Sequence, residues 1–212
     1  MNIFISSKLP VEPLDSVQFH SLVESAELIV ADTVAPKVMK RTNGNMLKFF
    51  RRKRLISSAM FAPYALRFVN NAFTLKSINI PSINPKRIFH YPEQKFHIVE
   101  YEPLEGDLLR GILQEAQNTQ LLELTAEFIA ELHFKGVYFR SLHFENIIWN
   151  GEKMGLIDVA DMKIYNNPLN KRLRQRNHQH YLRYPQDRSI LDKFGLEEFM
   201  SIYTKAFDRM HN

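Results

Sequence analysis

The sequence predicts a mixed α+β fold in two parts, a β-rich and basic part over residues 1–102 and a mainly helical part over residues 103–212. Three observations lead to this prediction. Short runs rich in β-branched and aromatic residues, separated by turn signals, dominate the first part. A long amphipathic pattern with helical spacing begins near Leu121 in the second part. Charge also divides the chain, because residues 33–92 contain no Asp or Glu.

The first part is expected to form a small antiparallel sheet with one helix. The sequence Thr-Asn-Gly-Asn at residues 42–45 is typical of a hairpin turn. Apolar residues recur at helical spacing over residues 64–78, which predicts a helix there. The expected strands cover residues 27–31, 37–40, 46–50 and 96–102, with a further turn at residues 32–36.

The second part is expected to be mainly helical. A helix over residues 121–135 would place Leu122, Thr125, Phe128, Ile129 and Leu132 on one face. Gly136 would end it. Residues 147–149 and 154–157 form a hairpin around an Asn-Gly turn. The remainder, from about residue 169, is expected to be helical and is rich in Arg and His.

Composition excludes several classes of function. The chain has no cysteine, which excludes disulfides and thiolate chemistry and favours a reducing compartment. The N-terminal apolar run is too short for a signal peptide, and no apolar stretch approaches the roughly 18 residues that span a bilayer. We therefore expect a cytoplasmic protein, with peripheral contact to a membrane left open.

The formal net charge of +5 hides an asymmetry. Residues 33–92 carry twelve Lys and Arg, and the remaining 16 basic residues face all 23 acidic ones, so the rest of the chain is net −7. Such a basic block suggests an anionic partner, such as phosphate groups, acidic lipid or nucleic acid. A solvated basic face is the alternative. Nucleic acid is disfavoured, because no motif of stacking aromatic residues accompanies the basic clusters.

Residues 133–158 carry the most specific pattern. They follow the protein-kinase template H-x-x-G-[apolar]-x-H-R-D-L-x-x-x-N, then a short hairpin, an apolar pair and Asp. This predicts a small two-lobed protein-kinase-like fold with the lobe boundary at residues 102 and 103. The residues at template positions are Arg140, Leu142, Asn146 and Asp158.

Several residues are candidates for binding nucleotide and metal. Asn146 and Asp158 offer an amide oxygen and a carboxylate, the hard oxygen donors that hold Mg²⁺ beside phosphate. Lys48 lies on the expected third strand, where kinases place the Lys that contacts the α- and β-phosphates. The strand end at Glu100, Tyr101 and Glu102 is a candidate hinge whose backbone would pair with adenine, although any strand end offers the same groups.

The pattern also departs from the template. Ser141 stands where the catalytic Asp is expected, and no glycine precedes Gly44 to form a phosphate-binding loop. The helix after Lys48 carries no Glu, and the residues roughly where that Glu is expected are Arg67, Phe68 and Asn71. Losing a general base typically costs about 10²–10⁴-fold in rate. Asp161 is the favoured replacement, and His143 and Glu145 are the alternatives. His143 would otherwise bind the neighbouring loop or a phosphate. Arg140 completes the candidate catalytic residues, which are therefore Ser141, Arg140, Asp161 and His143.

Here the chain resembles a known family. Residues 37–184 look like the lipopolysaccharide-core sugar kinases (Kdo and heptose kinases) of Gram-negative bacteria, and like proteins labelled toluene-tolerance. The resemblance rests on residues 46–54, 75–81, 101–106, 133–146 and 156–161. It implies ATP, Mg²⁺ and transfer to a sugar hydroxyl of a lipid-linked or phosphorylated acceptor at the inner face of the inner membrane.

Two hypotheses follow. The first is an atypical ATP- and Mg²⁺-dependent kinase of a lipopolysaccharide-core sugar. The second is a pseudokinase, a regulatory or binding module of envelope assembly, which the absent catalytic Asp favours. A peptide substrate is less expected, because no A-P-E motif follows Asp158. The basic segment 171–183 would either contact acceptor phosphates or pack as a helix with solvated charges. The sequence does not indicate an oligomeric state.

Overall fold

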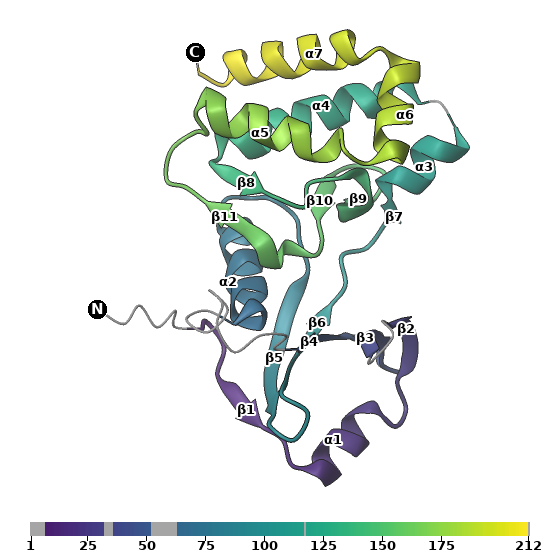
Figure 1. The fold of residues 1–212 in the computed structure, drawn as a ribbon, viewed down its shortest axis with the longest axis vertical. Coiled ribbons are helices and arrows are strands. Elements are labelled where there is room, and N and C mark those ends of the chain that lie inside the picture. The colour runs from purple at the N-terminus through teal and green to yellow at the C-terminus, as the bar shows by residue number, and fades with distance from the viewer. Residues whose placement is uncertain (1–6, 32–35, 52–62, 117, 212) are drawn as a thin grey trace. The chain divides into compact units, whose positions relative to one another are not determined.

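Two structural units make up the chain. The computed structural model describes residues 7–31, 36–51, 63–116 and 118–211 (Figure 1). By their contacts, Met1–Thr74 and Ser82–Leu104 form the first unit, whereas Leu75–Pro81 and Glu105–Asn212 form the second. A sheet with helices in the first unit and a mostly helical second unit confirm the predicted α+β class. None of the helices that the described residues form is long and apolar enough to cross a membrane.

The first unit is built on a six-stranded sheet with the strand order β1-β5-β6-β4-β3-β2. Its neighbouring strands pair antiparallel, except that β1 runs parallel to β5 at one edge. Helices α1 (Ser16–Val23) and α2 (Tyr64–Ser77) accompany the sheet. The strands are β1 (Val11–Pro13), β2 (Glu27–Ala31), β3 (Pro36–Lys40), β4 (Met46–Arg51), β5 (Asn84–Tyr91) and β6 (Phe96–Glu102).

Alternation along the strands produces the core of this unit. In β4 the side chains of Leu47 and Phe49 are buried on one face, while the residues between them are only partly covered. Helix α1 packs on the buried face, where Phe19 stacks on Tyr91 with ring centroids 4.2 Å apart. Asp15 starts α1 with a capping box, which satisfies backbone N–H groups at the helix start.

The second unit holds two small sheets and five helices among its described residues. Helix α4 (Thr119–Phe134) packs against α7 (Leu196–Arg209). The five α4 residues predicted to share one face are all buried, which confirms that prediction. The remaining elements are β7 (Asp107–Leu108), α3 (Leu109–Glu115), β8 (Val137–Phe139), β9 (Ile147–Trp149), β10 (Met154–Leu156), β11 (Met162–Ile164), α5 (Lys171–Tyr181) and α6 (Pro185–Phe194).

Most of the expected elements are present. Strands β2 and β6 have the predicted bounds, and β9 pairs antiparallel with β10 as expected. Strand β5 was missed, because its start contains Pro85 followed by two exposed basic residues, which breaks the alternation. The C-terminal helical stretch is three helices, since Pro185 begins α6 and Gly195, with φ of 106°, ends it.

Three expectations from the sequence are not settled by these elements. The turn at residues 32–36 lies, except for Pro36, outside the described residues, and so do residues 52–54 of the basic run. A lobe boundary at residues 102 and 103 stays a prediction. The division by contacts differs from it by assigning Leu75–Pro81 to the second unit.

Candidate active site

The loop that follows β8 carries most of the candidate catalytic residues. Leu142 and Phe144 are buried, and the backbone N–H of Leu142 donates to Phe139 O over 3.1 Å. A 3-10 helix, Phe144–Asn146, leads into β9. Because its apolar residues anchor the loop, the polar residues between them have fixed positions.

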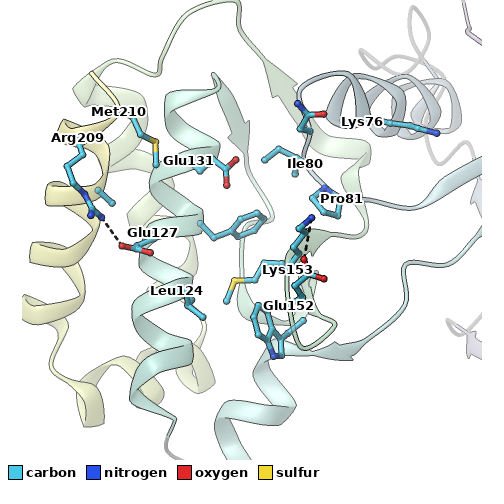
Figure 2. Close-up of a pocket in the computed structure, with 15 residues that line it drawn as sticks. Lys76, Ile80, Pro81, Leu124, Glu127, Glu131, Glu152, Lys153, Arg209 and Met210 are labelled. Atoms are coloured by element: carbon cyan, nitrogen blue, oxygen red, sulfur yellow. Dashed lines mark hydrogen bonds and ion pairs between the residues drawn. The ribbon is translucent and has the colours of Figure 1, made fainter. Parts of the chain in front are cut away.

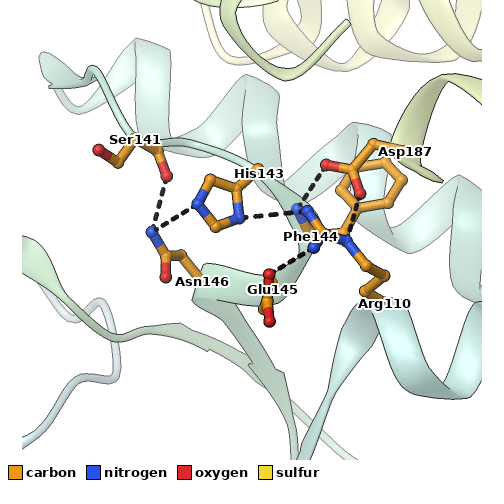
Figure 3. A network of polar contacts seen from close by, with 7 residues as sticks. All are labelled: Arg110, Ser141, His143, Phe144, Glu145, Asn146 and Asp187. Atoms are coloured by element: carbon orange, nitrogen blue, oxygen red, sulfur yellow. Dashed lines mark hydrogen bonds and ion pairs between the residues drawn. The ribbon is translucent and has the colours of Figure 1, made fainter. Parts of the chain in front are cut away.

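Asn146 is oriented by the loop itself. Its amide Nδ2 donates to Ser141 O over 2.8 Å and lies 3.2 Å from His143 Nε2. The amide oxygen consequently points away from Ser141 (Figure 3). This is the orientation that a metal ligand at Asn146 would need, since only the oxygen binds a hard cation.

Asp158 follows β10 in the left-handed backbone conformation, with φ of 54° and ψ of 40°. A non-glycine residue there is strained, and such strain is concentrated at functional sites. The N–H of Ile157 donates to Asn146 O over 3.0 Å, which holds the two candidate ligands near each other. An amide oxygen and one carboxylate fit Mg²⁺ that draws its other ligands from phosphate and water. No cluster of three or more His, Cys, Asp or Glu suited to a metal occurs among the described residues.

Ser141 and Asp161 meet directly. Strand β11 pairs with β8 in a register that sets Met162 opposite Phe139, so the preceding residue reaches the start of the loop. Ser141 Oγ donates to Asp161 Oδ2 over 2.6 Å. The other oxygen, Oδ1, is buried and has no hydrogen-bond partner within the described residues. A carboxylate therefore stands beside the serine that occupies the template's Asp position.

A buried ion pair also holds this loop in place, and no pattern in the sequence indicated it. Arg110 Nε on α3 donates to Asp187 Oδ1 on α6 over 2.7 Å, and Asp187 Oδ2 accepts from the N–H of Phe144 over 2.9 Å (Figure 3). Asp187 is 0% exposed. Arg110 also bonds Glu145, a residue that the loop exposes. No motif marks either partner in the sequence, because they come together only in the tertiary fold.

His143 belongs to this network. Its Nδ1 lies 3.4 Å from Arg110 Nη2, and its ring lies 4.4 Å from that of Tyr184. Burial, followed by the charge of Arg110, lowers the pKa of His143, while Asp187, Glu145 and Asp158 act in the opposite direction. The imidazole is therefore neutral at pH 7. Its neighbours within hydrogen-bond or ring-contact distance are Arg110, Asn146 and Tyr184.

His133, the first residue of the template, is a structural anchor. It is 0% exposed, and its Nε2 lies 3.0 Å from Asn177 Oδ1. Because Asn177 Nδ2 donates to Phe139 O over 2.6 Å, its oxygen must accept from His133. His133 Nδ1 then accepts from Tyr203 OH, 2.8 Å away. Burial lowers the pKa of His133 to about 3, with help from the charges of His178 and Arg174.

Lys48 lies in the first unit, at the middle of β4. It is opposite Val38 of β3 and Val99 of β6. Its ammonium group lies 5.6 Å from the ring centroid of Phe68 on α2. Phe68 is one of the residues that the sequence places where kinases carry a Glu.

The three candidate hinge residues also lie in the first unit, where their side chains form contacts with other residues of that unit. Glu100 is 4% exposed and accepts from Arg41 over 2.7 Å and from Asn45 over 2.9 Å. Tyr101 packs edge-on against Phe68, with ring centroids 5.5 Å apart. Glu102 forms an ion pair with Lys86 over 2.8 Å. Adenine pairing by this strand's backbone stays a prediction.

The candidate residues thus fall into two groups. The loop and its neighbours in the second unit bring together Ser141, Asp161, His143, Asn146 and Asp158. Lys48 and the hinge candidates belong to the first unit.

A separate groove lies elsewhere on the second unit. Its volume is about 830 Å³, and it runs between α4, the end of α7 and the β9–β10 hairpin (Figure 2). Glu127 at its rim is bonded by Arg209 over 2.8 Å. None of the candidate catalytic, nucleotide-binding or metal-binding residues lines it. Its size alone therefore does not make it the candidate active site.

Comparisons with known proteins extend only to the fold. No family model and no curated protein matches the sequence. Among solved structures, 1052 chains are similar, so the fold is widely shared. One of them, described as WaaP in complex with acyl carrier protein, has 12% sequence identity and a TM-score of 0.50. The similarity covers 92% of each chain. The protein accordingly has a mixed α+β, protein-kinase-like fold.

Proposed function

We propose that this protein is an atypical ATP- and Mg²⁺-dependent phosphotransferase acting on a sugar hydroxyl of a lipid-linked acceptor of the lipopolysaccharide core. The observation that carries the proposal is the hydrogen bond from Ser141 to Asp161, with Asp161 Oδ1 buried and unbonded among the described residues. This contact places a carboxylate beside Ser141, at the position where the kinase template has its catalytic Asp. The acceptor class comes from the sequence resemblance and is supported by the fold.

Asp161 would act as the general base. The acceptor hydroxyl would give its proton to Asp161 Oδ1 as its oxygen attacks the γ-phosphorus of ATP. The bond from that phosphorus to the β–γ bridging oxygen would break, and ADP would leave. Ser141 would be a positioning residue, because its hydroxyl donates to Oδ2 and leaves Oδ1 without a bond from the serine.

Asn146 and Asp158 would hold Mg²⁺, and their oxygens are suited to it. The ion, when bound, supplies positive charge to the phosphate oxygens of ATP. Lys48 would contact the α- and β-phosphates, and the strand end at residues 100–102 would pair with adenine. Arg140, next to Ser141, would add positive charge at the phosphoryl-transfer site.

The test is phosphate incorporation from labelled ATP into dephosphorylated core oligosaccharide linked to lipid A. Asp161→Asn is expected to lower kcat by about 10²–10⁴-fold. It should leave intact the rise in melting temperature that ATP and Mg²⁺ produce. Asp192→Asn is the matched control, since Asp192 is exposed on α6 and pairs only with Arg188 among the described contacts. Equal activity of wild type and Asp161→Asn would remove Asp161 as the base.

A pseudokinase remains the competing function, because Ser141 replaces the catalytic Asp and Arg67, Phe68 and Asn71 stand where an acid is expected. A Ser141→Asp variant that gains turnover while wild type shows none would support it. Equal loss of turnover in Lys48→Ala and Asp158→Asn would exclude it, since a protein without turnover has none to lose.

Contact with a membrane follows from a lipid-linked acceptor. The basic block of residues 33–92 would favour the anionic inner face of the inner membrane, where each basic residue near the surface adds about 1 kcal/mol. Flotation with vesicles containing phosphatidylglycerol, compared with pure phosphatidylcholine vesicles, tests this. Equal partition to both kinds of vesicle would contradict an electrostatic attraction.

A further inference from the structure

Helix α5 is fixed to the strand that leads into the candidate catalytic loop. Asn177, buried in the middle of α5, donates from Nδ2 to Phe139 O over 2.6 Å. Phe139 is the last residue of β8 and directly precedes Arg140. The C-terminal half of α5 is therefore held beside the loop.

Basic groups from both segments interact with His180. His180, in the last turn of α5, interacts with the charges of Arg183, Arg176 and Arg140 and with that of Asp161. Arg176 and Arg183 belong to α5 and the residues that follow it, whereas Arg140 belongs to the turn after β8. All three arginines are exposed. Three guanidinium groups and the carboxylate of Asp161 thus lie near one imidazole.

Two polar atoms in this cluster have no hydrogen-bond partner within the described residues although both are buried. They are His180 Nε2 and Asp161 Oδ1. Buried polar atoms are almost always bonded, so each of these two atoms is a position where a water molecule or a ligand group would complete the bonding. A nitrogen that can donate and an oxygen that accepts suit a molecule carrying both an anion and a hydroxyl.

Helix stabilisation explains only part of this arrangement. Basic side chains in the last turn of α5 interact favourably with the negative end of the helix dipole. That effect accounts for the basic side chain of Arg183, which closely follows the end of α5. It does not account for Arg140, which comes from another segment, or for the unbonded oxygen of Asp161.

We propose that Arg140, Arg176, Arg183 and His180 form an anion subsite that binds a phosphate monoester already present on the acceptor sugar. Guanidinium groups bind phosphate through paired, charge-assisted hydrogen bonds. The same acceptor would present its hydroxyl to Asp161 Oδ1. The substrate class is then a phosphorylated sugar, and this part of the inference rests on the proposed function, whereas binding of the anion does not.

The test measures binding without nucleotide, by calorimetric titration at low salt. The probes are glucosamine 1-phosphate, unphosphorylated glucosamine and inorganic phosphate. Phosphatidylcholine vesicles with and without phosphatidic acid separate a lipid headgroup from a sugar phosphate. Glucosamine 1-phosphate is expected to bind, glucosamine is not, and inorganic phosphate should bind more weakly than the sugar phosphate. Added salt should weaken the binding.

Substitutions then locate the subsite. Arg176→Gln and Arg183→Gln should each weaken binding of glucosamine 1-phosphate about tenfold, the effect of one lost charge-assisted contact. Arg188→Gln is the matched control, because Arg188 is an exposed arginine on α6 paired with Asp192. Since the substituted side chains are exposed, the variants should keep the wild-type melting curve, which circular dichroism checks.

Three results would overturn the subsite. They are equal binding of glucosamine and its phosphate, unchanged binding in both α5 variants, and binding of phosphatidic acid vesicles but not of the soluble sugar phosphate. Phosphate transfer that persists in spite of such a result would leave the proposed function standing. Binding as expected with no transfer to any core acceptor would instead remove the proposed function and keep the anion subsite.

Discussion

Each unit contains a buried carboxylate held by an arginine, and the two have different consequences. Asp187 in the second unit is 0% exposed and joins Arg110 to the backbone of the candidate catalytic loop. Glu100 in the first unit is 4% exposed and joins Arg41 and Asn45, which flank the turn between β3 and β4. An ion pair of the same kind therefore holds the candidate active site in one unit and a hairpin in the other. Polar burial by itself does not identify a functional residue.

Removing Asp187 should have the largest effect on stability. Asp187→Ala leaves Arg110 buried without its carboxylate and the N–H of Phe144 without an acceptor, which should cost about 3–5 kcal/mol. The protein's single tryptophan, Trp149 in β9, reports unfolding of the second unit by fluorescence in urea. The double variant Arg110→Met with Asp187→Leu should recover much of the loss, because it removes both charges. A loss below 1 kcal/mol in the single variant would contradict this role.

A substitution at Gly136 should have the next largest effect among the changes proposed here for the second unit. A Cβ there would lie 2.1 Å from Tyr165 O, and its φ of +76° is unfavourable for other residues. Gly136→Ala should cost about 3 kcal/mol. Gly151 is the matched control in the same unit, with φ of +93° but nothing within 4 Å, so Gly151→Ala should cost only about 1 kcal/mol. Equal losses of unfolding free energy in the two variants would show that the backbone shifts and relieves the contact with Tyr165 O.

Acid should weaken the second unit in a defined pH range. Burial lowers the pKa of His133 to about 3 and that of His178 to about 4, against 6.5 in the unfolded chain. The unfolded state therefore binds more protons below pH 6.5, so stability is full above that pH and falls towards pH 4. A loss of about 2 kcal/mol per histidine is expected at pH 5. Urea unfolding at several pH values, with His178→Asn for comparison, measures it, and a parallel pH dependence of the two proteins would exclude His178.

The carboxylate of the first unit should matter least. Glu100→Gln keeps an acceptor for Asn45 but removes the charge that faces Arg41, which should cost about 1 kcal/mol. Glu102→Gln is the control, because the ion pair of Glu102 with Lys86 is exposed and worth less than that. Amide exchange of β3 and β4 reports the effect within this unit. Faster exchange in the Glu102 variant than in the Glu100 variant would reverse the assignment.

The sequence predicts a structural feature best when residues close together in the chain determine that feature. The turn with Gly44 and the spacing of apolar residues in α4 are local, and both were predicted. The loop motif marked Asn146, whose amide is oriented by a carbonyl five residues away, and its role as a metal ligand stays a prediction. Asp187 could not be found, because it lies 43 residues from the N–H group that it binds.

The contact between Ser141 and Asp161 could be predicted only in part from the sequence. The sequence named Asp161 only by its distance from Asp158, and Ser141 only as a departure from a template. Their contact follows from the pairing of β8 with β11, two strands of three residues each, which no periodicity reveals. Whether Asp161 is a base stays a prediction.

The left-handed backbone at Asp158 decides how substitutions there can be interpreted. Asparagine tolerates that conformation nearly as well as aspartate does, whereas alanine pays about 1 kcal/mol for it. An alanine variant would mix the loss of negative charge with a local relaxation of the chain. The asparagine variant changes the charge alone, and any difference between the two proteins measures how far the peptide geometry, rather than the carboxylate, governs this position.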